Sequence, residues 1–330
     1  MNSTTNAQDQ NSGEVKIDSY CKQPIIKSLS KHLHKFGLLH LMALPTVILL
    51  IIFNYAPMFG IIMAFQNYQP LKGVLGSEFV GFKNFEFLFA TKDVWIITRN
   101  TVCYNLVFIA LNLVLAVALA ILLNEIYFKK FAKVLQTIFI MPHFLSMAVV
   151  AILVMSFLSR NSGFVNQLLQ SIGFEGNTDW YLTKSIWPPL LVFVNAWKGV
   201  GYSAVVYLAC ISGIPNEHYE AAIIDGASRR QQIRYITLPH LRTMIVILFI
   251  MSIGGIFRGD FGLFYTVTAN SGALYSVTDV IDTYVFRALT KLNNIGMSTA
   301  AGLFQSVVGF ILIVIVNKIV TKVDSDSALF

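Results

Sequence analysis

Charged side chains are rare in the apolar parts of this 330-residue chain, and three of them occur inside long apolar stretches. Lys198 lies near the middle of residues 186–211, and Arg258 and Asp260 lie in the later part of residues 243–266. A charge in apolar surroundings is stable only where another group pairs with it or where it reaches water. These three residues are therefore candidates for binding a polar solute or for forming an ion pair.

Asn195 and Tyr202, on the same stretch as Lys198, complete this candidate substrate pathway. Arg258 and Asp260 are two residues apart, so they would point to opposed sides of a helix and should not pair with each other. An ion pair between Asp260 and Lys198 on neighbouring helices is one interpretation, and outward reach of Arg258 to water is another. Four glycines at positions 254, 255, 259 and 262 predict a broken or widened helix that exposes backbone polar groups to a cavity.

The elements that must position these residues follow from composition. Apolar residues make up 55% of the chain and charged residues 12%, whereas ordinary soluble domains carry about 25% charged residues. Several uncharged runs exceed the roughly 20 residues that cross a 30 Å hydrocarbon core. We therefore predict an all-α integral membrane protein with polar tails at residues 1–35 and 323–330. Its membrane domain, residues 36–322, contains six transmembrane helices, at 38–64, 101–124, 134–158, 186–211, 243–266 and 299–320.

Basic residues are distributed unevenly between the two sides of such a six-helix chain. One side carries fourteen Lys and Arg residues in both tails, after the second span and around residues 215–242, and the other side carries eight. Cytoplasmic loops are enriched in Lys and Arg, so both termini and the 215–241 loop are predicted to be cytoplasmic, in a bacterial-type plasma membrane. The net charge of +7 is then explained by topology, and no nucleic-acid partner is predicted. Trp180 and Trp187 are expected to form an interfacial aromatic belt, with sugar stacking as the alternative.

The polar loop at residues 215–241 is much longer than two membrane helices need as a connection. Asn216 is a strong N-cap for a first short helix, and Gly226 should end that helix in the left-handed conformation. Residues 228–231 have the pattern of a capping box that opens a second helix, and Leu238-Pro239 is predicted to stop it. The expected structure is a helix, a glycine elbow and a second helix that project from the bilayer. An amphipathic loop lying on the lipid headgroups is the alternative.

This loop resembles the EAA loop of the membrane subunits of binding-protein-dependent ABC importers. Glu220-Ala221-Ala222 is followed by three residues, Gly226, nine residues and Ile236-x-Leu238-Pro239, without a gap. Stretches at 55–62, 80–85 and 255–262 also resemble the carbohydrate-importer branch, in particular its LplB-type permeases for complex saccharides. The resemblance extends from about residue 35 to residue 321.

The resemblance implies a type I ABC importer permease fold and a coupling mechanism. In that family the EAA helix docks into a cleft on a cytosolic ATPase dimer, whose ATP-driven closure swings the permease from inward- to outward-facing. The residues implied in coupling are Glu220, Ala221, Ala222, Asp225, Gly226, Leu238 and Pro239. The implied partners are a second permease (a different, homologous chain), the ATPase dimer with its ATP and Mg²⁺, an extracytoplasmic solute-binding protein, a saccharide and membrane lipid.

Catalytic and nucleotide-binding motifs are missing from the sequence. It contains no G-x-x-x-x-G-K-[ST], no H-E-x-x-H and no G-x-S-x-G. We therefore expect a non-catalytic transport subunit that binds no cofactor or metal itself. A secondary transporter or channel subunit that is not coupled to an ATPase remains the alternative, although it gives no reason for the long polar loop.

Overall fold

The computed structural model describes residues 25–86, 92–173 and 178–323, and most of them are helical. The polar tails predicted at both ends lie largely outside these residues. The chain divides into two compact units, Met1–Phe59 and Gly60–Phe330. In the described residues, five helices are long and apolar enough to cross a membrane, and one bent helix pair provides a sixth crossing if it counts as one span.

The first unit contains α1 (Ile25–Leu50) and the π-helical turn η1 (Ile51–Tyr55). The 3-10 helix η2 (Ala56–Phe65) begins in this unit and ends in the second. Pro45 lies inside α1 and Pro57 near the start of η2. A proline cannot donate a backbone hydrogen bond, so the helix changes type in this region instead of continuing as one regular α-helix. The apolar part, Gly37–Phe65, overlaps the first predicted span.

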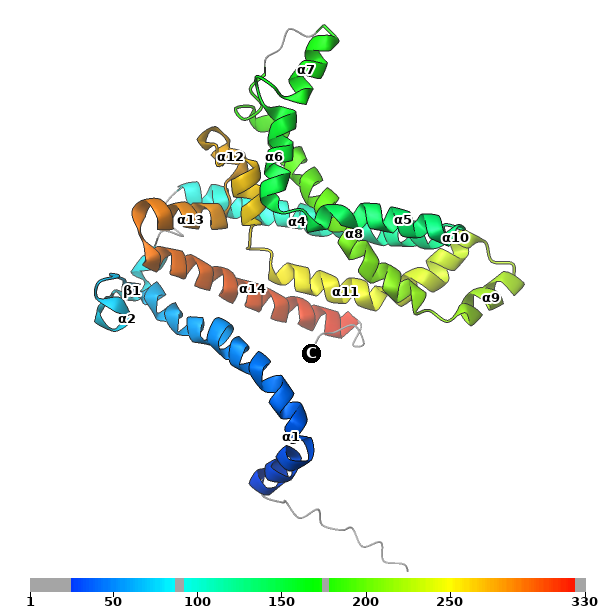
Figure 1. The fold of residues 1–330 in the computed structure, drawn as a ribbon, viewed down its shortest axis with the longest axis horizontal. Helices are drawn as coiled ribbons and strands as arrows, with labels where there is room; N and C mark the ends of the chain where they lie inside the picture. Colours follow the sequence, from blue (N-terminus) through cyan, green and yellow to red (C-terminus); the bar gives the residue numbers. More distant parts are fainter. Residues whose placement is uncertain (1–24, 87–91, 174–177, 324–330) are drawn as a thin grey trace, which may run out of the picture. The chain divides into compact units, whose positions relative to one another are not determined.

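Four long helices form the core of the second unit (Figure 1). They are α4 (Lys92–Glu125), α8 (Trp187–Ser212), α11 (Leu238–Gly254) and α14 (Ile295–Val323). α4 packs along α8, and α11 packs along α14. Between η2 and α4 lies a hairpin whose antiparallel strands β1 (Gln66–Asn67) and β2 (Glu78–Phe79) pair Gln66 with Phe79. α2 (Gly73–Gly76) lies between these strands, and η3 (Gly81–Phe85) follows them.

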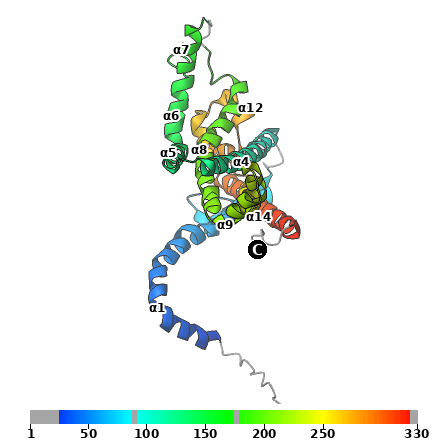
Figure 2. The ribbon, with the colours of Figure 1, turned by 90° about the vertical axis from the view of Figure 1, so that its right-hand side faces the viewer.

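The third predicted span, residues 134–158, is not one continuous helix, because the chain bends there. α5 (Lys129–Ile140) and the short η4 (Met141–Phe144) are followed by α6 (Met147–Leu158) at an angle of 97°. Pro142 lacks a donor for a continuing helix, and the Ser146 hydroxyl accepts a hydrogen bond from the Val149 N–H to begin a new one. In two perpendicular views α6 leads away from the helical core to α7 (Phe164–Ser171) (Figures 1 and 2).

The fifth span also differs from the prediction. Leu238-Pro239 does not stop the preceding helix, because α10 (Arg229–Gln232) continues through the π-helix η6 (Ile233–Thr237) into α11. Pro239 lies in the first turn of α11, where its missing N–H is tolerated. The π-type bond from the Leu238 N–H to the Ile233 carbonyl keeps the chain helical up to this proline. The predicted glycine-rich break is confirmed: α11 ends at Gly254, and the widened π-helix η7 (Gly262–Val267) follows.

A short outer segment connects η7 to α14 through η8 (Gly272–Leu274), α12 (Tyr275–Thr278) and α13 (Ile281–Leu292). The core beside it contains Tyr104, Phe108, Leu191 and Phe264. Trp187 is fully buried in this core, and its indole N–H donates to the Trp180 carbonyl, so the predicted aromatic belt is wrong for Trp187. The η5 turn (Lys184–Ile186) and Pro188 at the start of α8 direct that ring inward.

Candidate translocation site and coupling loop

A cavity of about 280 Å³ lies between α4, α8 and α11. All of its lining residues are uncharged, and they combine amide and hydroxyl groups with aromatic and aliphatic side chains. Such a lining can exchange hydrogen bonds with a hydroxyl-rich solute and pack against its apolar faces. The lining includes Asn105, Phe108, Asn112, Asn195, Gly199, Ser203, Tyr207, Phe249 and Ser252.

Asn195 is the one residue of the predicted pathway in this lining. Its side-chain oxygen accepts a hydrogen bond of 2.8 Å from the Asn112 amide nitrogen. The Asn112 oxygen is buried and accepts no hydrogen bond from the described residues, so it is free to accept one from a solute. A Cβ at Gly199 would come within 3.1 Å of that oxygen, so glycine keeps the approach open.

The sequence analysis missed Asn105 and Asn112. They are seven residues apart in one uncharged run, which places them on the same face of α4 two turns apart. Asn105 donates to the carbonyls of Ile256 and Arg258, and thereby caps the backbone that the break after α11 leaves unpaired. An asparagine pair at this spacing in an apolar helix is the signal that would have identified the site.

Lys198 lies half-buried in α8 but does not pair with Asp260, so the predicted ion pair is wrong. Its ammonium donates to the carbonyls of His143 and Leu145, at 2.8 and 2.6 Å. These two carbonyls belong to the bend between α5 and α6, where regular helical bonding stops. The charge of Lys198 therefore stabilises the bend, because no other described donor bonds these carbonyls across that gap.

Tyr202 lies one turn after Lys198, and its ring stacks on the His143 ring at a centroid distance of 4.3 Å. The Tyr202 side chain is half exposed, so the ring pair forms part of the surface of α8 beside the bend. A Cβ at Gly201 would overlap the Phe139 carbonyl oxygen at 1.9 Å, which shows how closely α5 and α8 pack here.

Arg258 and Asp260 lie in the non-helical break of the fifth span, and both side chains are exposed. Asp260 accepts a hydrogen bond from the Leu263 N–H and so caps the start of η7. Arg258 contacts the Ser306 hydroxyl of α14 at 3.4 Å. Each of these two residues thus has its own partner near the break, and the prediction that they do not pair with each other is confirmed.

The carboxylate of Asp282, on α13, fixes the same break. It accepts hydrogen bonds from the Gly259 N–H at 2.5 Å and from the Gln305 amide at 3.1 Å. Burial raises the pKa of Asp282, and these hydrogen bonds together with the nearby Arg258 charge oppose that rise. The sequence alone gave no sign of this residue's role.

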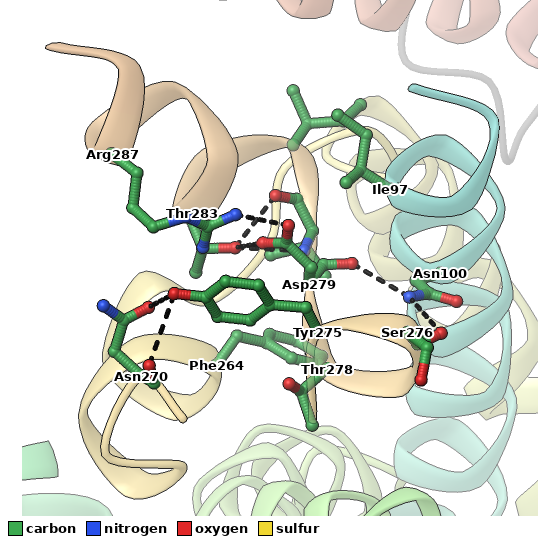
Figure 3. Close-up of polar contacts among 12 residues, drawn as sticks. Ile97, Asn100, Phe264, Asn270, Tyr275, Ser276, Thr278, Asp279, Thr283 and Arg287 are labelled. Atoms are coloured by element: carbon green, nitrogen blue, oxygen red, sulfur yellow. Dashed lines mark hydrogen bonds and ion pairs between the residues drawn. The ribbon is translucent and has the colours of Figure 1, made fainter. Parts of the chain in front are cut away.

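A second polar cluster holds α12 and α13 against the beginning of α4 (Figure 3). Asp279 forms an ion pair with Arg287 and accepts a hydrogen bond of 2.6 Å from Thr283. The Arg287 guanidinium also lies 4.0 Å above the centre of the Tyr275 ring. Asn100 of α4 donates to the Asp279 carbonyl at 3.0 Å. The outer segment is therefore tied to a long helix through bonded polar groups.

The loop at residues 215–241 contains the predicted helix, elbow and second helix. α9 (Asn216–Ile224) ends before Gly226, whose φ of +77° is the expected left-handed conformation. Ser228 and Gln231 form the predicted capping box at the start of α10. Pro215 takes the cap position of α9, and Asn216 is the first residue inside the helix. The prediction that Asn216 caps this helix is therefore wrong.

One face of α9 packs on the second helix and the other is open. Tyr219 bonds to Thr237 at 3.0 Å, and Ala222 is half-buried. Glu220, Ala221 and Asp225 are exposed, as are Leu238 and Pro239 at the start of α11. Ile223 and Ile224 are also exposed, although a water-facing helix usually buries such side chains.

Glu220 also lines a cleft of about 520 Å³ between α9 and the turn that joins α4 to α5. The charged residues in the cleft lining are Glu125, Lys129, Glu220 and Arg229. Besides the chain itself, the bond of Tyr219 to Thr237 holds α9 to η6, and the His218 ring contacts the His240 ring of α11 at a centroid distance of 5.5 Å.

Comparisons with known proteins agree with this architecture. Residues 112–325 match the family described as binding-protein-dependent transport system inner membrane component. The chain is 38% identical to the polygalacturonan/rhamnogalacturonan transport system permease protein YteP of Bacillus subtilis, over 86% of this chain and 88% of that protein. It is 35% identical to the protein LplB of the same organism, over 87% of this chain and 90% of that one.

Solved structures give the same result. The chain is similar to a bacterial ABC transporter involved in the import of the acidic polysaccharide alginate, with a TM-score of 0.80 and 33% identity over 90% of this chain and 99% of that one. A structure of the bacterial alginate ABC transporter in complex with alginate pentasaccharide-bound periplasmic protein matches with a TM-score of 0.78. The chain belongs to the family of inner-membrane permease components of binding-protein-dependent ABC transport systems.

Proposed function

We propose that this chain forms one half of the translocation pathway of an ATP-driven saccharide importer and receives its motion through α9. The observation that carries the proposal is the exposed face of α9, with Glu220 and Ala221 followed by the left-handed elbow at Gly226. A short helix that shows charged and apolar side chains to water suits a partner that covers it.

The partner proposed for α9 is a separate cytosolic ATPase dimer, which binds ATP and Mg²⁺. Small side chains at Ala221 and Ala222 permit close approach, and Glu220 is available to meet a basic or amide group. Closure of the ATPase dimer would then move α9 and, through η6, the long helix α11. In this scheme the chain itself is not catalytic, and the loop and both termini lie in the cytoplasm.

The proposed cargo is an oligo- or polysaccharide. The uncharged amides and hydroxyls of the 280 Å³ cavity can match sugar hydroxyls, and the unpaired Asn112 oxygen can accept from one of them. The saccharides named for the relatives, polygalacturonan, rhamnogalacturonan and alginate, support this class. A second, different permease and an extracytoplasmic binding protein would complete the transporter.

The test uses two substitutions in the assembled transporter. Gly226→Pro cannot adopt the positive φ of the elbow, and Glu220→Lys reverses the charge on the open face of α9. We expect both variants to assemble with the ATPase less tightly and to lose the stimulation of ATP hydrolysis by loaded binding protein. Glu78→Lys, the same charge change at an exposed position outside the 215–241 loop, is the control and should retain most of the stimulation. Unchanged transport in both test variants would contradict the proposal.

A further inference from the structure

The hairpin formed by residues 66–85 has an unusual distribution of polar and apolar side chains. Gln66 and Ser77 are buried inside it, whereas Leu71, Leu75 and Phe79 are exposed. A loop that faces water normally shows the opposite arrangement, because apolar surface is driven out of water. The hairpin is therefore built to have its outer surface covered by something apolar.

The exposed leucines belong to a hairpin whose conformation is fixed by internal hydrogen bonds. The Ser77 hydroxyl donates to the Gly73 carbonyl at 2.6 Å and accepts from the Gln69 N–H at 3.0 Å. Gln66 reaches across the hairpin and donates to the Val74 carbonyl at 3.0 Å. Internal polar bonds thus fix a tip whose leucines, four residues apart, both point fully outward.

The position of the hairpin indicates what covers it. Its first strand follows directly on Phe65, the last residue of the first apolar helix. Asn84 donates to the carbonyls of Ala64 and Gln66, and a Cβ at Gly296 would lie 2.6 Å from the Asn84 nitrogen. The hairpin therefore rests on the first turn of α14, beside the ends of two membrane-crossing helices (Figure 1).

The ends of membrane-crossing helices lie at the edge of the bilayer, so the bilayer edge is the apolar medium nearest to the hairpin. Leu71 is six residues from Phe65, which is at most about 20 Å of chain, and the strand pairing folds it back. Lys72 lies beside the two leucines and is exposed, as expected of a side chain that reaches lipid phosphates while its neighbours enter the acyl region. Phe79 and Phe82 add exposed aromatic rings, which favour the membrane boundary.

We propose that the tip of this hairpin, centred on Leu71 and Leu75, inserts into the phospholipid boundary and anchors the end of the first span to it. A tip with two fully exposed leucines fits a deformable lipid surface and needs no preformed groove on a partner. The proposal depends on the membrane position of the chain and not on the identity of the cargo.

The experiment places a fluorescent probe at the tip in the complete transporter. Cys21, Cys103 and Cys210 are first replaced by serine, and Leu75→Cys is then labelled with an NBD dye in phosphatidylcholine–phosphatidylglycerol vesicles. Glu78→Cys, exposed on the strand face opposite Phe79, is the matched control. Because both positions are exposed, neither label should disturb assembly.

We expect the label at position 75 to emit at shorter wavelength than the label at 78, to be quenched by nitroxide-bearing lipids and to be protected from aqueous iodide. Equal iodide quenching at the two positions would overturn the proposal. Protection at 75 that appears only after substrate-loaded binding protein is added would overturn it as well, and would identify a protein-docking surface instead.

Discussion

Replacing Lys198 by methionine should disorder the bend between α5 and α6 more than it destabilises the whole protein. The substitution keeps most of the apolar stem of the side chain but removes the ammonium and with it both bonds to the carbonyls of His143 and Leu145. Hydrogen bonds to a charged group contribute about 1.5–3 kcal/mol each, so the bend loses about 3–6 kcal/mol. Removing a charge from membrane depth offsets about 2.5–3.5 kcal/mol of this, so the net effect lies between a gain of about 0.5 and a loss of about 3.5 kcal/mol.

The assay should therefore separate local order from global stability. A spin label at Phe144, an exposed residue in the bend, should become more mobile in Lys198→Met, while the melting temperature of the complex falls by a few degrees at most. Lys198→Arg keeps the charge and should restore much of the order. Lys184→Met removes an exposed lysine just before α8 and serves as the control. Unchanged label mobility in Lys198→Met, together with an altered choice between neutral and acidic saccharides, would show that Lys198 contacts cargo and does not order the bend.

Three further changes test other parts of the structure. Gly201→Ala forces a Cβ against the Phe139 carbonyl and should cost about 1–3 kcal/mol, seen as a lower melting temperature, whereas Gly213→Ala, with 3.4 Å of space, should cost little. Asn112→Leu should raise the saccharide concentration needed for half-maximal transport without loss of assembly, and equal affinity would argue against the cavity as a cargo site. Because burial raises the pKa of Asp282, the stability linked to its protonation is present at low pH and is lost as pH rises through that raised value. Asp282→Asn should flatten this pH dependence in melting curves, and an unchanged slope would contradict it.

Local chemistry allowed part of the structure to be predicted from the sequence. The left-handed Gly226 and the Ser228–Gln231 capping box depend on a few neighbouring residues, so their patterns were sufficient. The glycines between 254 and 262 indicated the broken fifth span for the same reason.

Features that depend on direction or on distant partners were not predictable in this way. Hydropathy measures how apolar residues 134–158 are but not whether they run straight, so the 97° bend went unseen. The carbonyls of His143 and Leu145 are open to Lys198 only because the helix bends there. A prediction that lacked the bend therefore paired Lys198 with Asp260. The cavity was missed because Asn112 and Asn195 meet only when α4 packs on α8.

Coupling through α9 is tested most directly by uptake into vesicles that contain both permeases, with labelled alginate or oligogalacturonate oligomers and their loaded binding protein outside. Oligomers should accumulate inside only when the ATPase is bound at α9 and ATP is enclosed, and not at all with Gly226→Pro. Accumulation in vesicles that lack the ATPase would show that transport does not need this coupling.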